Sequence, residues 1–378
     1  MRKEGIVIRQ PPARHLLVVN CGSATVKTKL FGSIAGRLDE IGAATSGVEG
    51  GYGVAVTRLL AALPAAPDAI AHRVVHGGAR FAAATRVTAS TIRELREVTA
   101  LAPIHNGPAI AGIEATLGAG VPVVALFDST FHASMPAVAY RYAIPDFPGV
   151  RRYGFHGWSH RWVTERYAEI TGSPEPTIIT LHLGSGSSAA AIRRGRSVDT
   201  SMGYSPLEGL AMATRPGDLD PGVLTHLLSD GMTVDRLVEM LNRECGMRAL
   251  AGSGDMRELL GRHDADAELA VELFCYRVRK YVGAYLAVLE GAEAVVFTGG
   301  IGERSPEIRR RICDRLGWAG LELDAARNQR GELRISRDGS RLAAYVIPTD
   351  EERLIAGEAV RFLGWEEGKE EASFAPPS

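Results

Sequence analysis

The sequence predicts an α/β protein of two related domains that hold a nucleotide between them. Two stretches share one plan: an apolar strand, a short turn rich in glycine and serine, and a second strand. They begin at residues 14 and 177, about 160 residues apart. A turn of this kind exposes backbone N–H groups and hydroxyls together, which suits a phosphate. The repetition indicates a duplicated domain with one phosphate-facing hairpin in each half.

Composition bounds the class of protein. The chain has 378 residues, enough for two domains at roughly 150 residues each. Its net charge of −1 gives no electrostatic drive toward nucleic acid or an acidic membrane, and the short arginine groups at 151–152, 193–196 and 309–311 are expected to be solvated surface. The 4 cysteines show no CxxC spacing, which argues against a zinc site or a secreted disulfide scaffold. No signal-like or membrane-length apolar run occurs, so we expect a cytoplasmic protein.

One early strand is expected over residues 69–78, where His72 and His76 are four residues apart. On a helix this spacing would suit zinc, but on a strand the two rings stand about 13 Å apart. The β-branched residues between them favour the strand. Arg73 would then point to the face opposite both histidines.

Two further polar residues stand where chemistry is expected. Asp128 follows the buried strand 122–127, at the end of a strand where open α/β sheets place their sites, although a helix N-cap is the alternative. His156 lies between glycines in RYGFHGWSH, which favours a loop histidine that approaches a ligand over a structural one.

The C-terminal half contains a second cradle of the nucleotide type. A strand at 294–297 leads into a glycine loop at 298–303, and Ser305 with Pro306 starts a helix. The last strand is expected at 346–348. Thr349 and Glu352 have capping-box spacing before the final helix, which would explain Glu352 and leave Glu351 for another role.

Short nucleotide motifs are weak here. GSGSSA at 184–189 matches the loose pattern GxGxxA, but that pattern needs a helix next and the chain turns again at RRGR. No GxxxxGK[ST] loop and no GxSxG elbow are present. Ordinary P-loop and serine-hydrolase interpretations are therefore excluded.

A longer series of segments resembles the acetate kinase family. VVNCGSATVKTKL, HRVVHGG, FDSTFHASMP, RYGFHGWSH, HLGSGSS, MGYSPLEGLAMATRPGDLDPG, FTGGIGE and IPTDEERLIA follow the order of that family's signatures. They cover residues 16 to about 363. The resemblance implies two duplicated ribonuclease H-like domains of the actin and sugar-kinase type around a nucleotide cleft. We expect domain I at 1–132 plus 353–378 and the nucleotide-binding domain II at 133–352.

The resemblance also implies roles for residues that match the family's motifs. The positions that organise Mg²⁺ (or Mn²⁺) match Asn20 and Glu351, and the catalytic positions match Asp128, His156 and Arg215. The carboxylate would bind Arg73, and its alkyl end would meet the apolar residues Val75, Ile104, Phe155 and Pro206. ATP would contact Lys27 and three segments, namely His182, Leu183, Gly184, Ser185 and Gly186; Asp255, Met256 and Arg257; and Gly300, Ile301, Gly302, Glu303 and Arg304.

The function implied is acetate kinase: reversible, Mg²⁺-dependent phosphoryl transfer from ATP to acetate or propionate, giving ADP and an acyl phosphate by direct in-line transfer. Loose phosphoryl-transfer transition states need positioning and charge neutralisation, which arginine, histidine and Mg²⁺ supply. Because acetate is already ionised near neutral pH, we interpret Asp128 mainly as an organiser of metal and arginine, although the family's corresponding aspartate is usually called the acid/base residue. A homodimer is expected, with no nucleic acid or membrane partner.

Departures from the family pattern leave alternatives open. Ser185 and Arg304 stand where the family has asparagines, and MATR stands for MGTR. The first turn carries Cys21, Ala24 and Thr25 where small serines are usual. A propionate or butyrate kinase, or an enzyme that uses pyrophosphate, is the first alternative. A nucleotide-binding regulator or weak phosphatase on the same fold is the second.

Overall fold

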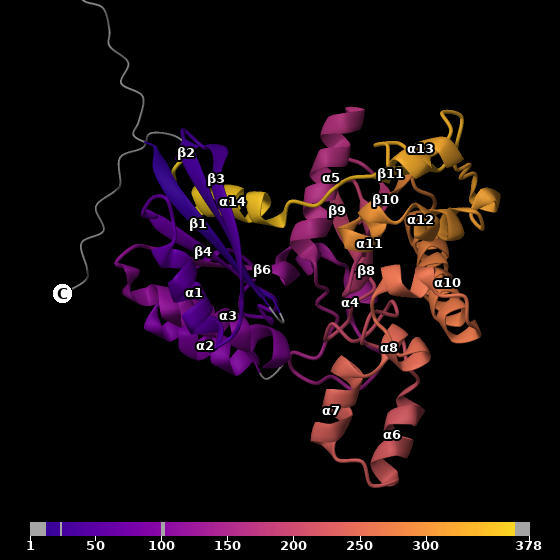
Figure 1. The fold of residues 1–378 in the computed structure, drawn as a ribbon, viewed down its shortest axis with the longest axis horizontal. Helices are drawn as coiled ribbons and strands as arrows, with labels where there is room; N and C mark the ends of the chain where they lie inside the picture. Colours follow the sequence, from indigo (N-terminus) through magenta and orange to yellow (C-terminus); the bar gives the residue numbers. More distant parts are fainter. Residues whose placement is uncertain (1–12, 23–24, 100–102, 367–378) are drawn as a thin grey trace, which may run out of the picture. The chain divides into compact units, whose positions relative to one another are not determined.

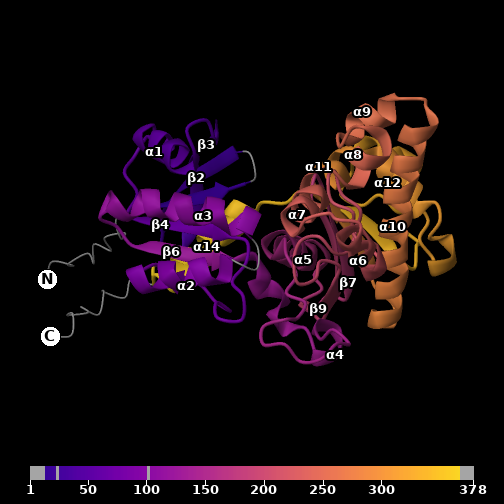
Figure 2. The same ribbon diagram turned by 90° about the horizontal axis from the view of Figure 1, so that it is seen from below.

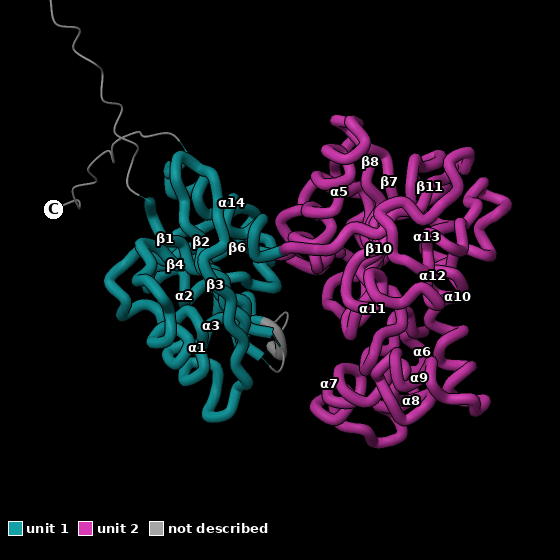
Figure 3. Tube along the Cα trace, turned by 45° about the horizontal axis from the view of Figure 1, so that its top comes forward, with its two compact units in different colours: residues 1–127, 351–378 teal, residues 128–350 magenta. Residues whose placement is uncertain are grey.

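Two compact units make up the chain. The computed structural model describes residues 13–22, 25–99 and 103–366, with the side chains of 103–105 left out. Unit 1 comprises 1–127 and 351–378, and unit 2 comprises 128–350 (Figure 3). The final helix therefore returns to the unit that holds the N-terminal strands. We propose these units as the two domains, with boundaries near those expected from the sequence.

Unit 1 is a six-stranded sheet with helices on both faces. Its strands are β1 (Arg14–Cys21), β2 (Thr25–Ile34), β3 (Arg37–Gly47), β4 (Ala69–Val74), β5 (Thr85–Arg86) and β6 (Val123–Phe127). Its helices are α1 (Tyr52–Ala61), α2 (Ala89–Thr99), α3 (Pro103–Thr116), the 3₁₀ turn η1 (Leu117–Ala119) and α14 (Glu351–Phe362). The helices α1, α2 and α3 cover one face and α14 covers the other (Figures 1 and 2).

Unit 2 is a five-stranded sheet with a larger set of helices. Its strands are β7 (Ile178–Leu183), β8 (Ser187–Arg193), β9 (Arg196–Thr200), β10 (Ala294–Thr298) and β11 (Ala343–Val346). Ahead of them come η2 (Asp128–Ser134), α4 (Ala137–Tyr140) and α5 (Gly157–Thr171). The later helices are α6 (Pro221–Ser229), α7 (Val234–Arg243), α8 (Gly246–Ala251), α9 (Met256–Gly261), α10 (Ala265–Leu289), α11 (Gly299–Arg304), α12 (Pro306–Cys313), η3 (Gly317–Ala319) and α13 (Ala325–Arg330).

The two sheets repeat one topology, which confirms the predicted duplication and fold class. Unit 1 has the order β3-β2-β1-β4-β6, with β5 added at the far edge, and unit 2 has β9-β8-β7-β10-β11. In each unit the first three strands pair antiparallel. The next strands pair parallel, β4 with β1 and β6 with β4 in unit 1, and β10 with β7 and β11 with β10 in unit 2, whereas the added strand β5 pairs antiparallel with β6. The two predicted phosphate hairpins, β1–β2 and β7–β8, therefore occupy equivalent places. Residues 23–24 of the first turn, including Ala24, lie outside the described residues.

Alternation along the strands assigns each side chain to a face. In unit 1, Leu17, Val19 and Ile70 join the core beneath α1–α3. In unit 2, Ile179, Leu181 and Leu183 join the core that α10 covers, whereas Ile178 packs against α5. The polar residues between these apolar ones must therefore face α14 in unit 1 and α5 in unit 2.

Four sequence expectations need correction. The segment 298–303 is a helix, α11, rather than a glycine loop, and the last strand is Ala343–Val346, earlier than 346–348. The capping box is absent, because the buried hydroxyl of Thr349 has no hydrogen-bond partner and Glu352 bonds elsewhere. The arginine at 309 is not solvated: Arg309 is 1% exposed and donates to the carbonyls of Gly302 and Glu303 at the end of α11.

Other local signals are confirmed. Asp220 followed by Pro221 is a sequence typical of a helix start, and the side chain of Asp220 caps α6 by accepting from Gly222 N. Ser305 caps α12 in the same way, followed by Pro306. Strand β8, not a helix, follows the GSGSSA turn, as the RRGR turn indicated.

No helix in the described part of the chain is long and apolar enough to cross a membrane.

Candidate active site

One group of predicted site residues lies on the α14 face of unit 1. Asn20 is the penultimate residue of β1, and because Val19 pairs with His72 in parallel register, the next residues Asn20 and Arg73 emerge side by side. Lys27 of β2 is the antiparallel partner of Asn20, so its exposed side chain shares that face. Strand pairing alone thus gathers three of the predicted site residues.

Helix α14 completes this group with two carboxylates. Arg73 Nη1 donates to Asn20 Oδ1 at 3.2 Å and lies 3.4 Å from Glu351 Oε2 in an ion pair. Asn20 Nδ2 donates to Glu352 Oε1 at 3.0 Å. The arginine therefore holds together the two oxygen-bearing side chains predicted to organise a metal, and Glu352 fixes the amide of Asn20 with its oxygen toward Arg73.

A second group of predicted site residues lies in unit 2, at the turn between β7 and β8. Gly184 N donates to Gly186 O at 3.1 Å, and Ser185 O accepts from Ala213 N at 3.1 Å. A Cβ atom on Gly184 would lie 4.0 Å from Gly300 N, the second residue of α11. The turn therefore sits beside the first turn of α11, which brings backbone N–H groups of the turn and of the helix close together.

His156 reaches this turn through a strained backbone. It has φ 56° and ψ 25°, a left-handed conformation that a non-glycine residue adopts at a cost of about 1–3 kcal/mol. The next residue must be glycine, because a Cβ on Gly157 would lie 1.8 Å from Asp128 O. Helix α5 thus begins directly against the backbone of the buried Asp128, which follows β6 as predicted. Strain maintained by such close packing is typical of functional positions.

Arg215 and His156 converge on Gly186. A Cβ on Gly186 would lie 2.8 Å from Arg215 Nη2 and 3.3 Å from both Cε1 and Nε2 of His156. Arg215 Nη1 donates to the carbonyl of the buried Pro206 at 2.9 Å, and among the described residues no carboxylate pairs with this arginine. Burial lowers the pKa of Arg215 to about 10, because desolvation disfavours its charge. An unneutralised cation and an imidazole edge therefore meet at the phosphate turn.

Histidines surround this point. His156 stacks on His182 with ring centroids 4.3 Å apart, and His182 Nδ1 bonds to Ser159 Oγ at 2.7 Å. His156 Nδ1 lies 3.0 Å from Ser188 Oγ, which also lies 2.7 Å from Nε2 of the buried His160. His160 is not among the predicted site residues; in the sequence it is only the residue four positions after His156.

The other predicted ATP segments are engaged in local structure. Asp255 caps α9 by accepting from Arg257 N, and its Oδ2 pairs with the Arg257 guanidinium at 2.7 Å. Glu303 Oε1 accepts from Gly299 N at 2.9 Å and Thr349 N at 3.1 Å. The carboxylates of Asp255 and Glu303 therefore accept hydrogen bonds from backbone N–H groups of this chain. Their segments are left with backbone N–H groups, such as those of Gly300, Ile301 and Met256, to offer a nucleotide.

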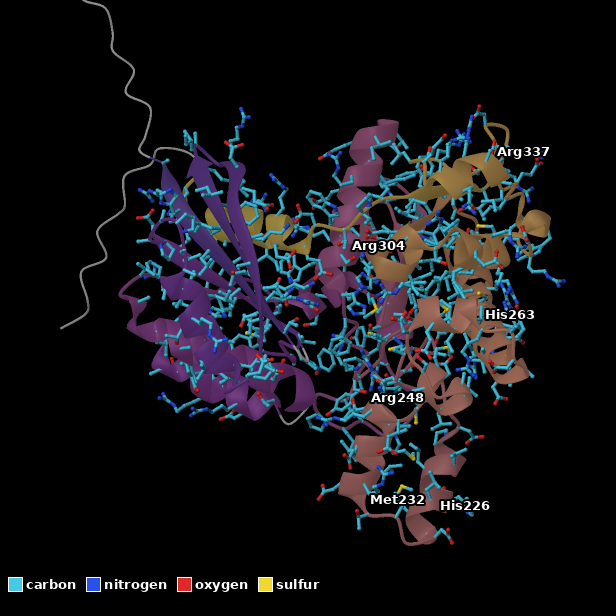
Figure 4. The ribbon with its side chains drawn as sticks, in the orientation of Figure 1. His226, Met232, Arg248, His263, Arg304 and Arg337 are labelled. Carbon is cyan, nitrogen blue, oxygen red and sulfur yellow. The ribbon has the colours of Figure 1, made fainter. Side chains whose placement is uncertain are left out.

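The side chain of Arg304, unlike those of Asp255 and Glu303, is not engaged in local structure. It is exposed at the C-terminal end of α11 (Figure 4), and no residue in the described part of the chain pairs with it. The sequence placed this arginine at a family asparagine, and the structure leaves its charge available to a ligand.

The residues predicted to enclose the alkyl group belong to both units. Val75, half-buried just past β4, lies in unit 1, as does Ile104, whose side chain is outside the described residues. Phe155 and Pro206 are buried in unit 2. The pocket thus stays a prediction, with two members already packed within their own unit.

The fold and these two groups define a class: a two-domain α/β protein with an acidic–amide group in one domain and a cationic phosphate turn in the other. Comparison with known proteins specifies the family. The family model for the acetokinase family matches residues 54–357. The acetate kinase of Solibacter usitatus is 49% identical over 313 residues, covering 78% of this chain and 76% of that protein.

Relatives with solved structures agree. The acetate kinase of Porphyromonas gingivalis aligns with a TM-score of 0.81 at 36% identity, covering 93% of this chain and 100% of that one. A propionate kinase from Francisella tularensis aligns with a TM-score of 0.83 at 35% identity, covering 91% of this chain and 98% of that one. The chain belongs to the acetokinase family, which confirms the predicted resemblance.

Proposed function

We propose that this protein transfers the γ-phosphoryl group of ATP reversibly to acetate, or to propionate, giving ADP and the acyl phosphate. The observation that carries this proposal is the half-buried Arg215, which has no carboxylate partner among the described residues and lies with His156 at the glycine turn. In the transition state of transfer, the phosphoryl group carries negative charge on its equatorial oxygens, and a desolvated guanidinium beside backbone N–H groups stabilises that charge.

The reaction needs no strong base. A carboxylate oxygen of acetate attacks the γ-phosphorus in line, the bond to the β–γ bridging oxygen breaks, and ADP leaves with that electron pair. Acetate is ionised near neutral pH, so no proton must be removed from the nucleophile. Asp128 is therefore proposed as an organiser of the site, and Arg73 as the group that binds the carboxylate of the substrate.

The side-chain oxygens of Asn20 and Glu351 in unit 1 are of the kind that bind Mg²⁺. Mg²⁺ is usually held by one or two carboxylates together with substrate phosphates and water, not by a protein cage. Asn20 Oδ1 and Glu351 Oε2 supply such oxygens, and the described residues contain no cluster of three or more His, Cys, Asp or Glu for a full cage. Bound Mg²⁺ would neutralise phosphate charge. Arg73 now holds both oxygens and would have to release at least one of them.

The nucleotide is proposed to bind unit 2. The turn from His182 to Gly186 and the first turn of α11 would contact phosphates through backbone N–H groups, with Asp255–Arg257 as a further contact in unit 2. Lys27, which belongs to unit 1, is proposed as an additional ATP contact. The carboxylates of Glu303 and Asp255 would act indirectly, by holding these segments in place.

The function is tested by trapping the product. Purified protein with ATP, Mg²⁺ and hydroxylamine should give acyl hydroxamate from acetate and propionate and less from butyrate. Each buried CH₂ changes binding by roughly 0.8 kcal/mol, so neighbouring acids should differ only several-fold unless they clash. No hydroxamate from any of the three acids, with either ATP or pyrophosphate, would contradict the kinase assignment.

A substitution at Ser185 tests, in the same assay, whether ATP or pyrophosphate is the phosphate donor. Ser185 is exposed on the glycine turn, and serine reaches less far than the family's asparagine. We expect Ser185→Asn to raise kcat/KM for ATP several-fold. Negligible ATP turnover in both proteins, with dominant turnover of pyrophosphate, would instead support the pyrophosphate alternative, which the unpaired charge of Arg304 favours.

Two substitutions should separate ground-state binding from transition-state stabilisation. We expect Arg73→Ala to raise the KM for acetate at least tenfold, because it removes the cation that holds the ionised carboxylate. His156→Ala should lower kcat roughly 10²-fold with little change in KM, because it acts on charge that develops later. Steady-state kinetics with each substrate varied measures both. A rise in KM alone in both variants would contradict these roles.

We further propose a cytoplasmic homodimer. The supporting observation is that α6 buries none of its side chains, while Val223, Leu228, Val234 and Val238 of α6 and α7 are exposed on two helices that extend from unit 2 (Figure 1). A second copy of the chain is the partner proposed for this apolar face, and sedimentation equilibrium of the full chain tests it. A cytoplasmic location would give the enzyme access to ATP.

A further inference from the structure

Four side chains in unit 2 form a continuous line of hydrogen bonds that ends at His156. Thr180 Oγ1 lies 2.8 Å from His160 Nδ1, and His160 Nε2 lies 2.7 Å from Ser188 Oγ. Ser188 Oγ lies 3.0 Å from His156 Nδ1. The line runs from β7 to α5, then to β8, and then to the loop before α5. The first three of these residues are not among the predicted site residues.

The line is closed to water up to its last member. Thr180, His160 and Ser188 are each 0% exposed. Burial, with smaller contributions from His132 and His182, holds the pKa of His160 well below its ordinary value. His160 is therefore a neutral imidazole near neutral pH, with one nitrogen that carries hydrogen and one that does not.

Counting hydrogens leaves two arrangements. The single proton of Ser188 Oγ can be donated to only one of the two imidazoles. If both imidazoles donated to Ser188, this buried proton would have no acceptor among the described residues, so one imidazole accepts from Ser188 and the other donates to it. In the outward arrangement, Thr180 donates to His160 Nδ1, His160 Nε2 donates to Ser188, and Ser188 donates to His156 Nδ1. In the inward arrangement every donation is reversed, and His156 Nδ1 carries the hydrogen.

The outward and inward arrangements differ in whether every buried hydrogen-bond donor has an acceptor. In the inward arrangement Thr180 Oγ1 accepts from His160, and its own proton has no acceptor among the described residues. A buried donor without a partner costs about 1–3 kcal/mol. The outward arrangement uses the proton of Thr180, Ser188 and His160 once each, and leaves no donor of these three unpaired.

We propose that Thr180, His160 and Ser188 are positioning residues that fix neutral His156 as the tautomer with hydrogen on Nε2. This inference rests on the proposed role of His156 at the transferring phosphoryl group. His156 Nε2 is the ring nitrogen next to Gly186, close to Arg215, where the phosphoryl oxygens are proposed to pass. A neutral His156 then donates a hydrogen bond to them without carrying charge.

The position of Arg215 makes a neutral donor useful. The guanidinium of Arg215 and the ring of His156 converge on the same point beside Gly186, and a second positive charge there would be repelled by the first. With hydrogen already on Nε2, the imidazole needs no protonation before it can donate. His156, held by the line of hydrogen bonds, thus donates a hydrogen bond to the phosphoryl group, while Arg215 supplies the positive charge.

The tautomer can be read directly by ¹⁵N NMR. Full-length protein labelled with ¹⁵N-histidine should show His156 Nδ1 as a pyridine-type nitrogen and Nε2 as a pyrrole-type nitrogen at neutral pH, with His156→Gln for assignment. In Ser188→Ala we expect a mixture of the two tautomers of His156. A pyrrole-type Nδ1 in the wild-type protein would overturn the proposal, and so would an unchanged His156 spectrum in Ser188→Ala.

Kinetics then tests whether the tautomer matters. Ser188→Ala and Thr180→Val should lower kcat roughly 10- to 100-fold with KM for ATP and acetate within about twofold, whereas Thr180→Ser keeps the donor and should restore kcat. The matched control is Ser197→Ala, which removes a buried serine bond to His132 Nδ1 of 2.8 Å in the same unit but leaves the line to His156 intact. Equal losses of kcat in Ser197→Ala and Ser188→Ala would show a structural effect only and overturn the proposal.

The NMR and hydroxamate results distinguish failure of this inference from failure of the proposed function. If no acyl hydroxamate forms but the tautomer of His156 is as expected and shifts in Ser188→Ala, the proposed function is wrong and the positioning role of Thr180, His160 and Ser188 stands. If hydroxamate forms and His156 carries its hydrogen on Nδ1, the function stands and the positioning role is wrong.

Discussion

Arg215→Ala is expected to lower kcat for acyl phosphate formation by roughly 10³-fold, the scale of an arginine that stabilises a transferring phosphoryl group. Burial lowers the pKa of Arg215 to about 10, and no described carboxylate compensates its charge. That cost is tolerated when a ligand supplies the missing negative charge. Arg215→Lys should recover little, since a point charge cannot reproduce the planar fork of guanidinium donors.

The control for this substitution is Arg248→Ala. Arg248 is an exposed arginine of the same unit (Figure 4) that donates to the carbonyl of Arg243, so its loss should leave kcat unchanged. Coupled assays of ADP release, together with circular dichroism to check folding, measure the effect. If folded Arg215→Ala retains more than about a tenth of the wild-type kcat, Arg215 does not stabilise the transferring group.

The pKa of Arg215 also predicts a pH dependence. Because the folded pKa is lowered relative to an ordinary arginine, the buried charge destabilises the fold below about pH 10, and that cost is relieved as pH rises through this value. Activity should change in the opposite sense, since the cation needed for catalysis is lost over the same range. In Arg215→Lys this alkaline loss should move or disappear.

Gly186→Ala is expected to lower kcat by a comparable amount, roughly 10³-fold, while the protein still folds. The added Cβ would lie 2.8 Å from Arg215 Nη2 and 3.3 Å from the ring of His156, so both side chains must move away from the place where they converge. Thermal stability should change little, because the closest atom is the end of a flexible arginine. The same steady-state assay, with the melting temperature as a second readout, measures both effects.

Gly339→Ala is the matched control, since a Cβ on that exposed loop glycine of unit 2 meets nothing within 4 Å. It should change neither kcat nor the melting temperature. Full activity of Gly186→Ala would mean that Arg215 and His156 need not meet at this turn. Unfolding of Gly186→Ala would mean that the turn tolerates no displacement at all.

Much of the fold was predictable because local signals in this chain agree with one another. Runs of apolar residues give β1 and β7, glycine and serine give the turns after them, and their repetition gives the duplicated topology. Alternation of side chains along a strand placed Arg73 opposite His72, as observed. The resemblance carried by long motifs then predicted the acetokinase family, which the relatives confirm.

Errors arose where a local pattern had a competing long-range partner. Thr349 and Glu352 have the spacing of a capping box, but Glu352 accepts from Asn20, which is 332 residues away in the chain. Arg309 belongs to a run of arginines that looks like surface, yet it is buried because the carbonyls at the end of α11 and Asn328 satisfy its donors. Spacing cannot detect a partner that only packing of distant elements brings close.

By itself, the sequence determined the repeated domain, the strand ends that carry Asn20, Arg73 and Asp128, and the family to which the chain belongs. Only the tertiary structure decided what those side chains do to one another. Parallel pairing of β1 with β4 and the return of α14 place Arg73 between Asn20 and Glu351, and close packing of α5 on β7 and β8 joins Thr180, His160 and Ser188 to His156. Hydrogen-bond partners and buried charges depend on contacts a few ångströms long between residues far apart in the chain, and strand periodicity contains no record of them.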